Sequence, residues 1–148
     1  MHNIVLADHD ADDRDLFAEA VGFVDPEVNV TMARDGEELM NVLSGSKEKP
    51  DLIFLDLNMP RKNGKECLSE IRSDDDLRKI PVIIYTTSLN PLDIDDTYKD
   101  GADYFFRKPN SFDELKDVLH RILHISDLQA EKPLEKFVLN KNLQVESK

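Results

Sequence analysis

The stretch DLIFLDLNMPRKNG, residues Asp51–Gly64, contains the pattern from which the fold class follows. It starts with an apolar run, Leu52–Leu55, that leads directly into a carboxylate, Asp56. A segment containing proline and glycine comes next, and apolar residues then recur at helical spacing. Such an apolar run is typical of a strand that is covered on both faces of a parallel sheet. The stretch therefore predicts a strand that ends on an acid and is followed by a turn and a helix.

The rest of the chain repeats this alternation of strand and helix. Segments rich in β-forming residues lie at 3–8, 28–33, 51–56, 81–86 and 103–107. Helical patterns lie between and after them, at 13–24, 36–43, 64–72, 91–100 and 111–125, the fourth with only a thin apolar stripe. Strands that alternate with helices predict an α/β fold in which a doubly wound parallel sheet carries helices on both faces.

The first helical segment shows what periodicity and capping rules predict locally. Its apolar residues recur at spacings of three and four, which predicts an apolar stripe formed by Leu16, Ala20 and Phe23, with Phe17, Val21 and Val24 alongside it. Asp10 precedes this helix, and Asp13 stands three positions later, where a capping box has its acid. We expect Asp12, Asp13 and Asp15 to form a solvated acidic turn that suits the helix dipole.

Composition limits the kind of protein and its partners. A chain of 148 residues suits one domain, and its formal net charge of -12 argues against nucleic acid and anionic membranes as partners. The chain shows neither a signal peptide pattern nor an apolar window long enough for a membrane span. A single cysteine, Cys67, is compatible with a reducing compartment, so we expect a cytoplasmic protein.

Polar side chains stand where the predicted strands end. Asp8, Asp56, Thr86 and Lys108 follow or close the first, third, fourth and fifth strands. In open α/β sheets, ligands bind beyond the carboxyl ends of the strands, at the point where the strand order reverses. Two carboxylates, a hydroxyl and an ammonium group are therefore expected to converge on one crevice.

The motifs DLIFLDLNMPRKNG, PVIIYTTS and FFRKP together resemble the receiver domain of two-component response regulators, and the resemblance covers residues 2–125. It implies a flavodoxin-like sheet of strand order 2-1-3-4-5. It also implies that Asp56 accepts a phosphoryl group from a histidine kinase or a phosphotransfer protein. The chain would then be a phosphoacceptor rather than an enzyme in its own right.

The resemblance also implies a magnesium site. Magnesium in this family is held by the phosphoacceptor, by the second acid after the first strand, and by a main-chain carbonyl two residues beyond the phosphoacceptor. These positions are Asp56, His9 and Asn58 in this chain, and Asp8 matches an acid that acts through a water molecule.

Three further residues match positions that respond to phosphorylation in the family. Lys108 would pair with a phosphoryl oxygen, and the hydroxyl of Thr86 would donate a hydrogen bond to another. Phe105 matches the aromatic residue that rotates inward behind this hydroxyl, although it is equally well read as an ordinary aromatic residue of a strand.

His9 departs from the family pattern, which has two consecutive acids where this chain has Asp8 and His9. Magnesium prefers oxygen ligands, so the sequence leaves three interpretations open. In the first, the site still transfers phosphate but binds magnesium more weakly. In the second, the site no longer requires magnesium, and a protonated His9 beside Asp8 and Asp56 supplies the positive charge. In the third interpretation, imidazole selects a softer metal such as zinc or nickel.

We expect a receiver domain at residues 1–126 and a C-terminal tail at 127–148 that is too short for an output domain. One helical stripe in this tail contains Leu134, Phe137 and Val138, and it would pack on the receiver or on a second copy unless the tail is disordered.

The expected dimer or effector surface is formed by the fourth helix, the fifth strand and the fifth helix. The alternatives are a pseudo-receiver that binds partners without phosphorylation and, more weakly, a small phosphatase.

Overall fold

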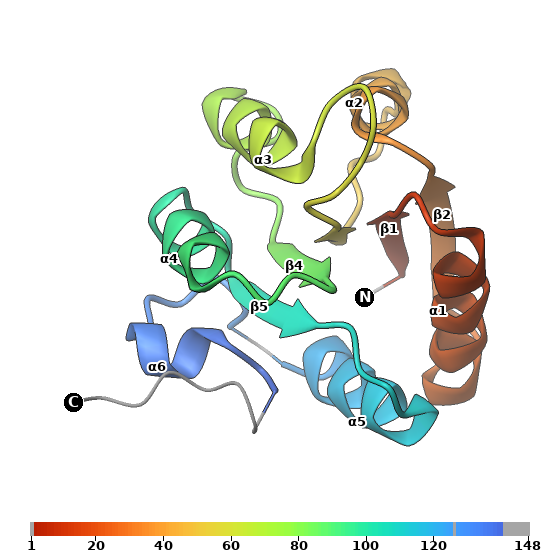
Figure 1. Cartoon of the computed structure of the whole chain (residues 1–148). Helices are drawn as coiled ribbons and strands as arrows, with labels where there is room; N and C mark the ends of the chain where they lie inside the picture. The colour runs from red at the N-terminus through yellow and green to blue at the C-terminus, as the bar shows by residue number, and fades with distance from the viewer. Residues whose placement is uncertain (1, 126, 141–148) are drawn as a thin grey trace.

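The computed structural model describes residues 2–125 and 127–140 (Figure 1). One parallel sheet of five strands has the order β2-β1-β3-β4-β5. The strands are β1 (Asn3–Ala7), β2 (Asn29–Ala33), β3 (Leu52–Leu55), β4 (Val82–Thr86) and β5 (Tyr104–Arg107). This confirms the expected α/β class, the flavodoxin-like strand order and the approximate strand positions.

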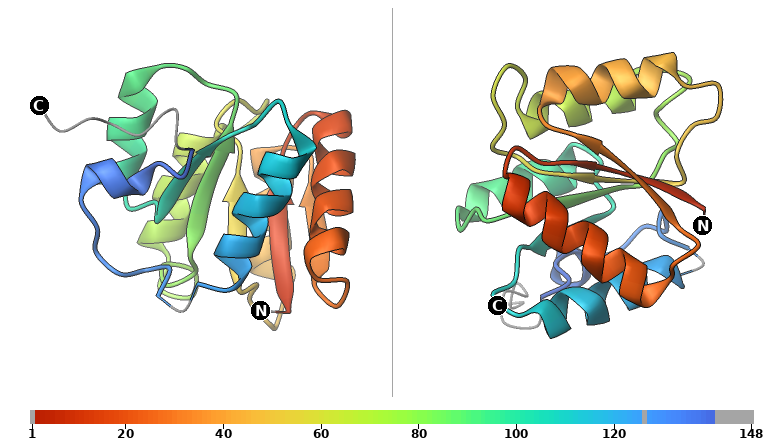
Figure 2. Two further views of the ribbon diagram at one scale, coloured as in Figure 1. Left: turned by 90° about the horizontal axis from the view of Figure 1, so that it is seen from below. Right: turned by 90° about the vertical axis from the view of Figure 1, so that its right-hand side faces the viewer.

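Helices cover both faces of the sheet (Figure 2). The helices are α1 (Ala11–Val24), α2 (Gly36–Gly45), α3 (Gly64–Ser73), α4 (Pro91–Lys99), α5 (Phe112–Leu123) and the short α6 (Leu134–Phe137). One buried apolar cluster joins the sheet to α2, α3 and α4, and a second joins it to α1 and α5. Within the described residues, we find no helix with the length and apolarity that crossing a membrane requires.

The N-terminal end of α1 confirms the predicted helix cap but not the predicted capping box. The side chain of Asp10 caps the helix by accepting a hydrogen bond of 3.0 Å from the main-chain N–H of Asp13. The expected capping box is wrong, because the carboxylate of Asp13 points to Lys108. A complete capping box occurs instead at α3, between Asn63 and Glu66.

The predicted apolar stripe of α1 is confirmed in part: Ala20 and the neighbouring Phe17 and Val21 are buried, whereas Leu16 and Phe23 are not. The buried residues of this helix are Phe17, Ala20 and Val21. Leu16 and Phe23 are 47% and 68% exposed, because they flank the face of the helix that meets the sheet. The ring of Phe23 instead packs against Phe112 of α5, with 6.0 Å between ring centroids. Helical spacing allowed two overlapping stripes, and it did not indicate which of them faces the sheet.

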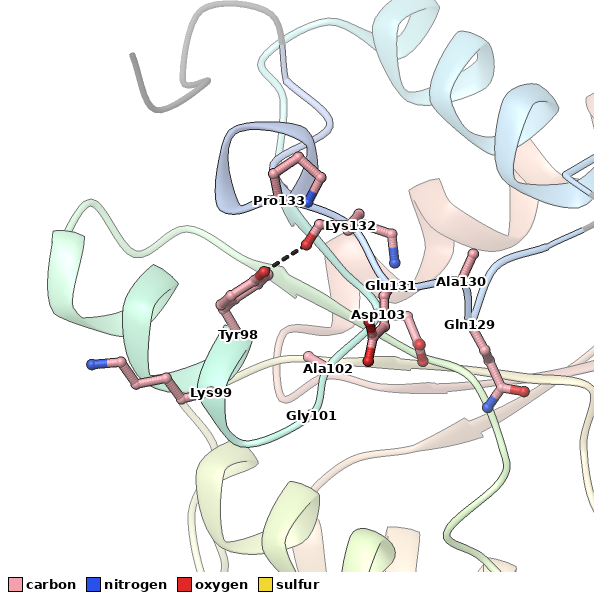
Figure 3. Close-up of a pocket in the computed structure, with 10 residues that line it drawn as sticks. All are labelled: Tyr98, Lys99, Gly101, Ala102, Asp103, Gln129, Ala130, Glu131, Lys132 and Pro133. Carbon is pink, nitrogen blue, oxygen red and sulfur yellow. Dashed lines mark hydrogen bonds between the residues drawn. The ribbon is translucent and has the colours of Figure 1, made fainter. Parts of the chain in front are cut away.

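The described part of the tail, residues 127–140, packs on β5 and α4. Phe137 is fully buried, and its ring centroid lies 6.2 Å from that of Phe105 and 5.2 Å from that of Tyr98. The hydroxyl of Tyr98 donates a hydrogen bond of 2.5 Å to the carbonyl of Lys132, beside a pocket between the end of α4 and the tail (Figure 3). The tail therefore packs on the receiver, one of the outcomes considered from the sequence.

Residues 138–140 also cover the free edge of β5. Val138 forms a parallel bridge with Phe105, and the N–H of Leu139 donates a hydrogen bond of 2.9 Å to the carbonyl of Phe105. The side-chain amide of Asn140 pairs with the main-chain N–H and carbonyl of Arg107, at 2.7 and 3.0 Å. An uncovered edge strand is a template for unwanted pairing, and this segment removes that hazard from β5. Residues 141–148 of the predicted tail and its boundary at 126 lie outside the described residues.

Replacing Phe137 with alanine tests whether the tail is docked in solution. Truncating a fully buried phenylalanine removes apolar burial and leaves a cavity, so we expect Phe137→Ala to lower the free energy of unfolding by about 3 kcal/mol. Denaturant titration measures this loss, and the matched control is Leu92→Ala on the exposed side of α4, which should stay within about 0.5 kcal/mol of the wild type. Equal stability of Phe137→Ala and the wild type would show that the tail does not dock.

Candidate functional site

The carboxyl ends of β1 and β3 lie side by side at the centre of the sheet, where the strand order reverses. Asp8 follows β1 and Asp56 follows β3, and the N–H of Asp56 donates a hydrogen bond of 3.0 Å to the carbonyl of Ala7. Both carboxylates are buried. Two negative charges at adjacent, buried strand ends repel each other, so the site requires a cation.

Lys108, just after β5, supplies that cation. Its Nζ lies 2.7 Å from Oδ2 of Asp8 and 3.1 Å from Oδ2 of Asp56, and its side chain is only 8% exposed. The N–H of Lys108 donates a hydrogen bond of 2.8 Å to the carbonyl of Thr86, which fixes the backbone at the end of β4. The structure thus brings together Asp8, Asp56 and Lys108, three of the four residues that the sequence placed at the strand ends.

A third carboxylate contacts the same ammonium group. Oδ2 of Asp13, in the first turn of α1, lies 2.8 Å from Nζ of Lys108 and accepts a hydrogen bond from it. The prediction that Asp13 belongs to a solvated turn is therefore wrong, whereas Asp12 and Asp15 are exposed as expected. Sequence reasoning missed Asp13 because its partner is 95 residues away and capping rules already offered it a local role.

Thr86, the fourth residue, is fully buried beside this cluster. Its hydroxyl oxygen accepts a hydrogen bond of 3.4 Å from the N–H of Ser88. Phe105 is buried in the apolar cluster on the α2, α3 and α4 side of the sheet, in contact with the tail through Phe137. The backbone of β5 therefore links Lys108, which faces the carboxylates, to Phe105, which faces the tail.

His9 lies outside the cluster of charges. Its side chain is exposed, and the described residues give it no ion pair with a carboxylate. The guanidinium group of Arg14 donates hydrogen bonds to the main-chain carbonyls of Asp8 and His9, at 2.8 and 3.1 Å, and so fixes this turn. In this structure the cation that contacts Asp8 and Asp56 is Lys108.

The loop after Asp56 is shaped by a close approach to α3. The N–H of Asn58 donates a hydrogen bond of 3.2 Å to Oδ1 of Asp56, so that the main chain wraps around this carboxylate. Gly64 begins α3 so close to β3 that a Cβ atom there would lie 2.2 Å from the carbonyl oxygen of Asp56. Only glycine fits this position, which explains the glycine that ends the stretch DLIFLDLNMPRKNG.

Burial and charge change the proton affinities of the cluster. Burial raises the pKa of Asp8 from 3.8 to about 6, although the nearby ammonium group of Lys108 opposes this rise. Burial also disfavours the charge of Lys108, but its close contacts with the carboxylates of Asp13 and Asp8 outweigh that effect and raise the pKa of Lys108 above its usual range. At neutral pH the site therefore holds a permanent ammonium group among carboxylates.

The donor set matches a hard divalent cation better than a soft one. Carboxylate oxygens and a main-chain carbonyl are ligands that magnesium and manganese accept. Oδ2 of Asp8 is buried and has no directed hydrogen bond, despite its short contact with Lys108. In the part of the chain that the structure describes, no three acidic, histidine or cysteine side chains are arranged to hold a metal as they stand. Metal binding would require that Lys108 release Asp8 and Asp56.

A flavodoxin-like sheet with two carboxylates at its switch point and a lysine after the last strand defines a receiver-type α/β domain. The chain belongs to the response regulator receiver domain family, which it matches over residues 4–120. It is 33% identical over 133 residues to the response regulator Rcp1 of Synechocystis sp., an alignment that covers 86% of this chain and 88% of Rcp1.

Solved structures agree with this assignment. The phosphorylated cyanobacterial phytochrome response regulator RcpA superposes with a TM-score of 0.76 at 34% identity, over 82% of this chain and 91% of RcpA. The manganese-bound form of Rcp1 superposes with a TM-score of 0.74 at 30% identity and the same coverage.

The raised pKa of Asp8 predicts a pH dependence of stability. Folded Asp8 keeps its proton up to about pH 6, whereas the unfolded chain releases it near 3.8, so the folded state binds more protons between these values. Stability of the wild type relative to Asp8→Asn should therefore fall as pH rises from 4 to 6, by on the order of 3 kcal/mol, and be constant above that. Denaturant titrations in a metal chelator measure this difference, and a difference that stays flat or increases with pH would contradict it.

Proposed function

We propose that Asp56 accepts a phosphoryl group from a sensor histidine kinase or a histidine phosphotransfer protein, and that the chain signals by protein–protein contact. The observation that carries this proposal is the buried ammonium group of Lys108, 3.1 Å from the carboxylate of Asp56. A carboxylate is a weak nucleophile for phosphorus unless the charge of the transferring group is neutralised and positioned beside it. Response regulator receiver domains act as phosphoacceptors, and a relative, RcpA, is known in a phosphorylated form.

In the proposed reaction, the phosphoryl group moves to Asp56, beside the ammonium group of Lys108. A carboxylate oxygen of Asp56 attacks the phosphorus atom of a phosphohistidine, the bond between phosphorus and the imidazole nitrogen breaks, and that nitrogen takes a proton from solvent, so that the donor's histidine leaves as neutral imidazole. The product is an acyl phosphate on Asp56. Lys108 stabilises the charge on the phosphoryl oxygens, because it is a fixed cation in a water-poor site. The hydroxyl of Thr86 donates a hydrogen bond to another phosphoryl oxygen once it turns from Ser88.

Receiver domains bind magnesium or manganese at their acidic site, and the manganese-bound form of Rcp1 is a structural neighbour. In this chain Asp56, the main-chain carbonyl of Asn58 and Asp8 would hold the cation. It would neutralise phosphoryl charge and orient the phosphoryl group. His9 stands where an acidic ligand is expected, so we propose that magnesium binding is weakened at this site. A softer metal that accepts imidazole is the alternative for His9.

The face formed by α4, β5 and α5 is our candidate surface for an effector or for a homodimer. Residues 138–140 already cover the edge of β5, so a partner that binds there must share or displace this segment. The net charge of -12 supports a protein partner rather than nucleic acid or membrane.

A phosphodonor assay tests the proposed function. Wild type incubated with acetyl phosphate and magnesium should gain the mass of one phosphoryl group, measured on the intact protein, because the carboxylate of Asp56 lies beside the ammonium group of Lys108. Asp56→Asn should gain none. A pseudo-receiver, the alternative that His9 suggests, would show no adduct in the wild type and a clear one in His9→Asp. That result would overturn the proposal.

A further inference from the structure

Asp13 has no part in the transfer described above, yet it makes one of the shortest contacts of the site. Its carboxylate oxygen lies 2.8 Å from Nζ of Lys108, and its side chain is 30% exposed. Helix α1 holds it in place, since its main-chain N–H is bound by the capping residue Asp10 at 3.0 Å. Asp13 is therefore a fixed acid at the open side of the cluster, whereas Asp8 and Asp56 are the buried acids.

The ammonium group of Lys108 has three N–H donors and three carboxylates around it. A divalent cation needs the carboxylates of Asp8 and Asp56, which the same ammonium group now contacts. When those two turn to the cation, Lys108 loses two partners and is repelled by the new charge. Asp13 is then the remaining carboxylate that can keep the ammonium group beside Asp56.

Charge balance leads to the same conclusion. Three carboxylates balance one ammonium group and one divalent cation. Without Asp13 the loaded site would carry excess positive charge in a partly buried place, which disfavours binding of the cation. The exposed His9 offers no carboxylate to make up the difference.

We propose that Asp13 is a positioning residue of the phosphoacceptor site, which retains Lys108 when a divalent cation takes over the carboxylates of Asp8 and Asp56. This inference rests on the proposed function, because it assumes that the site binds such a cation. Asp13 acts on the cation through Lys108 and is not itself a ligand.

Manganese binding measures this role without phosphorylation, because the electron paramagnetic resonance signal of free manganese reports how much is bound. We expect Asp13→Asn to bind manganese about tenfold more weakly than the wild type, as is usual when a residue that orients a metal site is removed. Asp12→Asn is the matched control: it removes the same charge from the same helical turn, but Asp12 is exposed and does not contact Lys108. Its affinity should stay within about twofold of the wild type, since exposed charges are screened.

A double-mutant cycle tests whether Asp13 changes manganese affinity through Lys108. In a Lys108→Met background no ammonium group competes for Asp8 and Asp56, so adding Asp13→Asn should leave manganese affinity unchanged. Circular dichroism confirms that each variant is folded. The proposal is overturned if Asp13→Asn binds as the wild type does, if its loss persists undiminished without Lys108, or if the wild type binds no manganese. A wild type that binds manganese but forms no phosphoryl adduct would overturn the proposed function and leave the role of Asp13 intact.

Discussion

The ammonium group of Lys108 is the interaction on which the site depends. A parallel sheet of this order places the acids after β1 and β3 next to each other, and both are buried. Uncompensated charges in such a place cost several kcal/mol each, at about the scale of the whole stability of a domain. Lys108 reaches these acids from the end of β5 and also contacts Asp13 on α1, so four elements meet at one charged atom.

The same arrangement connects the site to the surface of the domain. Lys108 directly follows Arg107, whose main chain pairs with Asn140 of the tail, and Phe105 on the same strand packs against Phe137. A change in the position of Lys108 therefore acts on a strand whose outer edge is held by residues 138–140. The structure thus contains a short physical route between the carboxylates and the face proposed for partners.

The sequence alone predicted the sheet, because apolar runs and acids at strand ends follow from burial and topology. It also predicted that Asp8, Asp56 and Lys108 converge. Asp13 could not be predicted in this way, since only the reach of a side chain across 95 residues of sequence brings it to Lys108. The exposure of Leu16 and Phe23, and the docking of the tail on β5, depend in the same way on which surfaces meet in three dimensions.

The most direct test of this account is nitrogen-15 NMR of the lysine side chains in the metal-free protein. The ammonium signal of Lys108 should show slow hydrogen exchange and couplings across hydrogen bonds to the carboxyl carbons of Asp13 and Asp56. Lys99, which is exposed, serves as the reference for a lysine in water. An ammonium signal of Lys108 that exchanges as fast as that of Lys99, with no such couplings, would contradict the account.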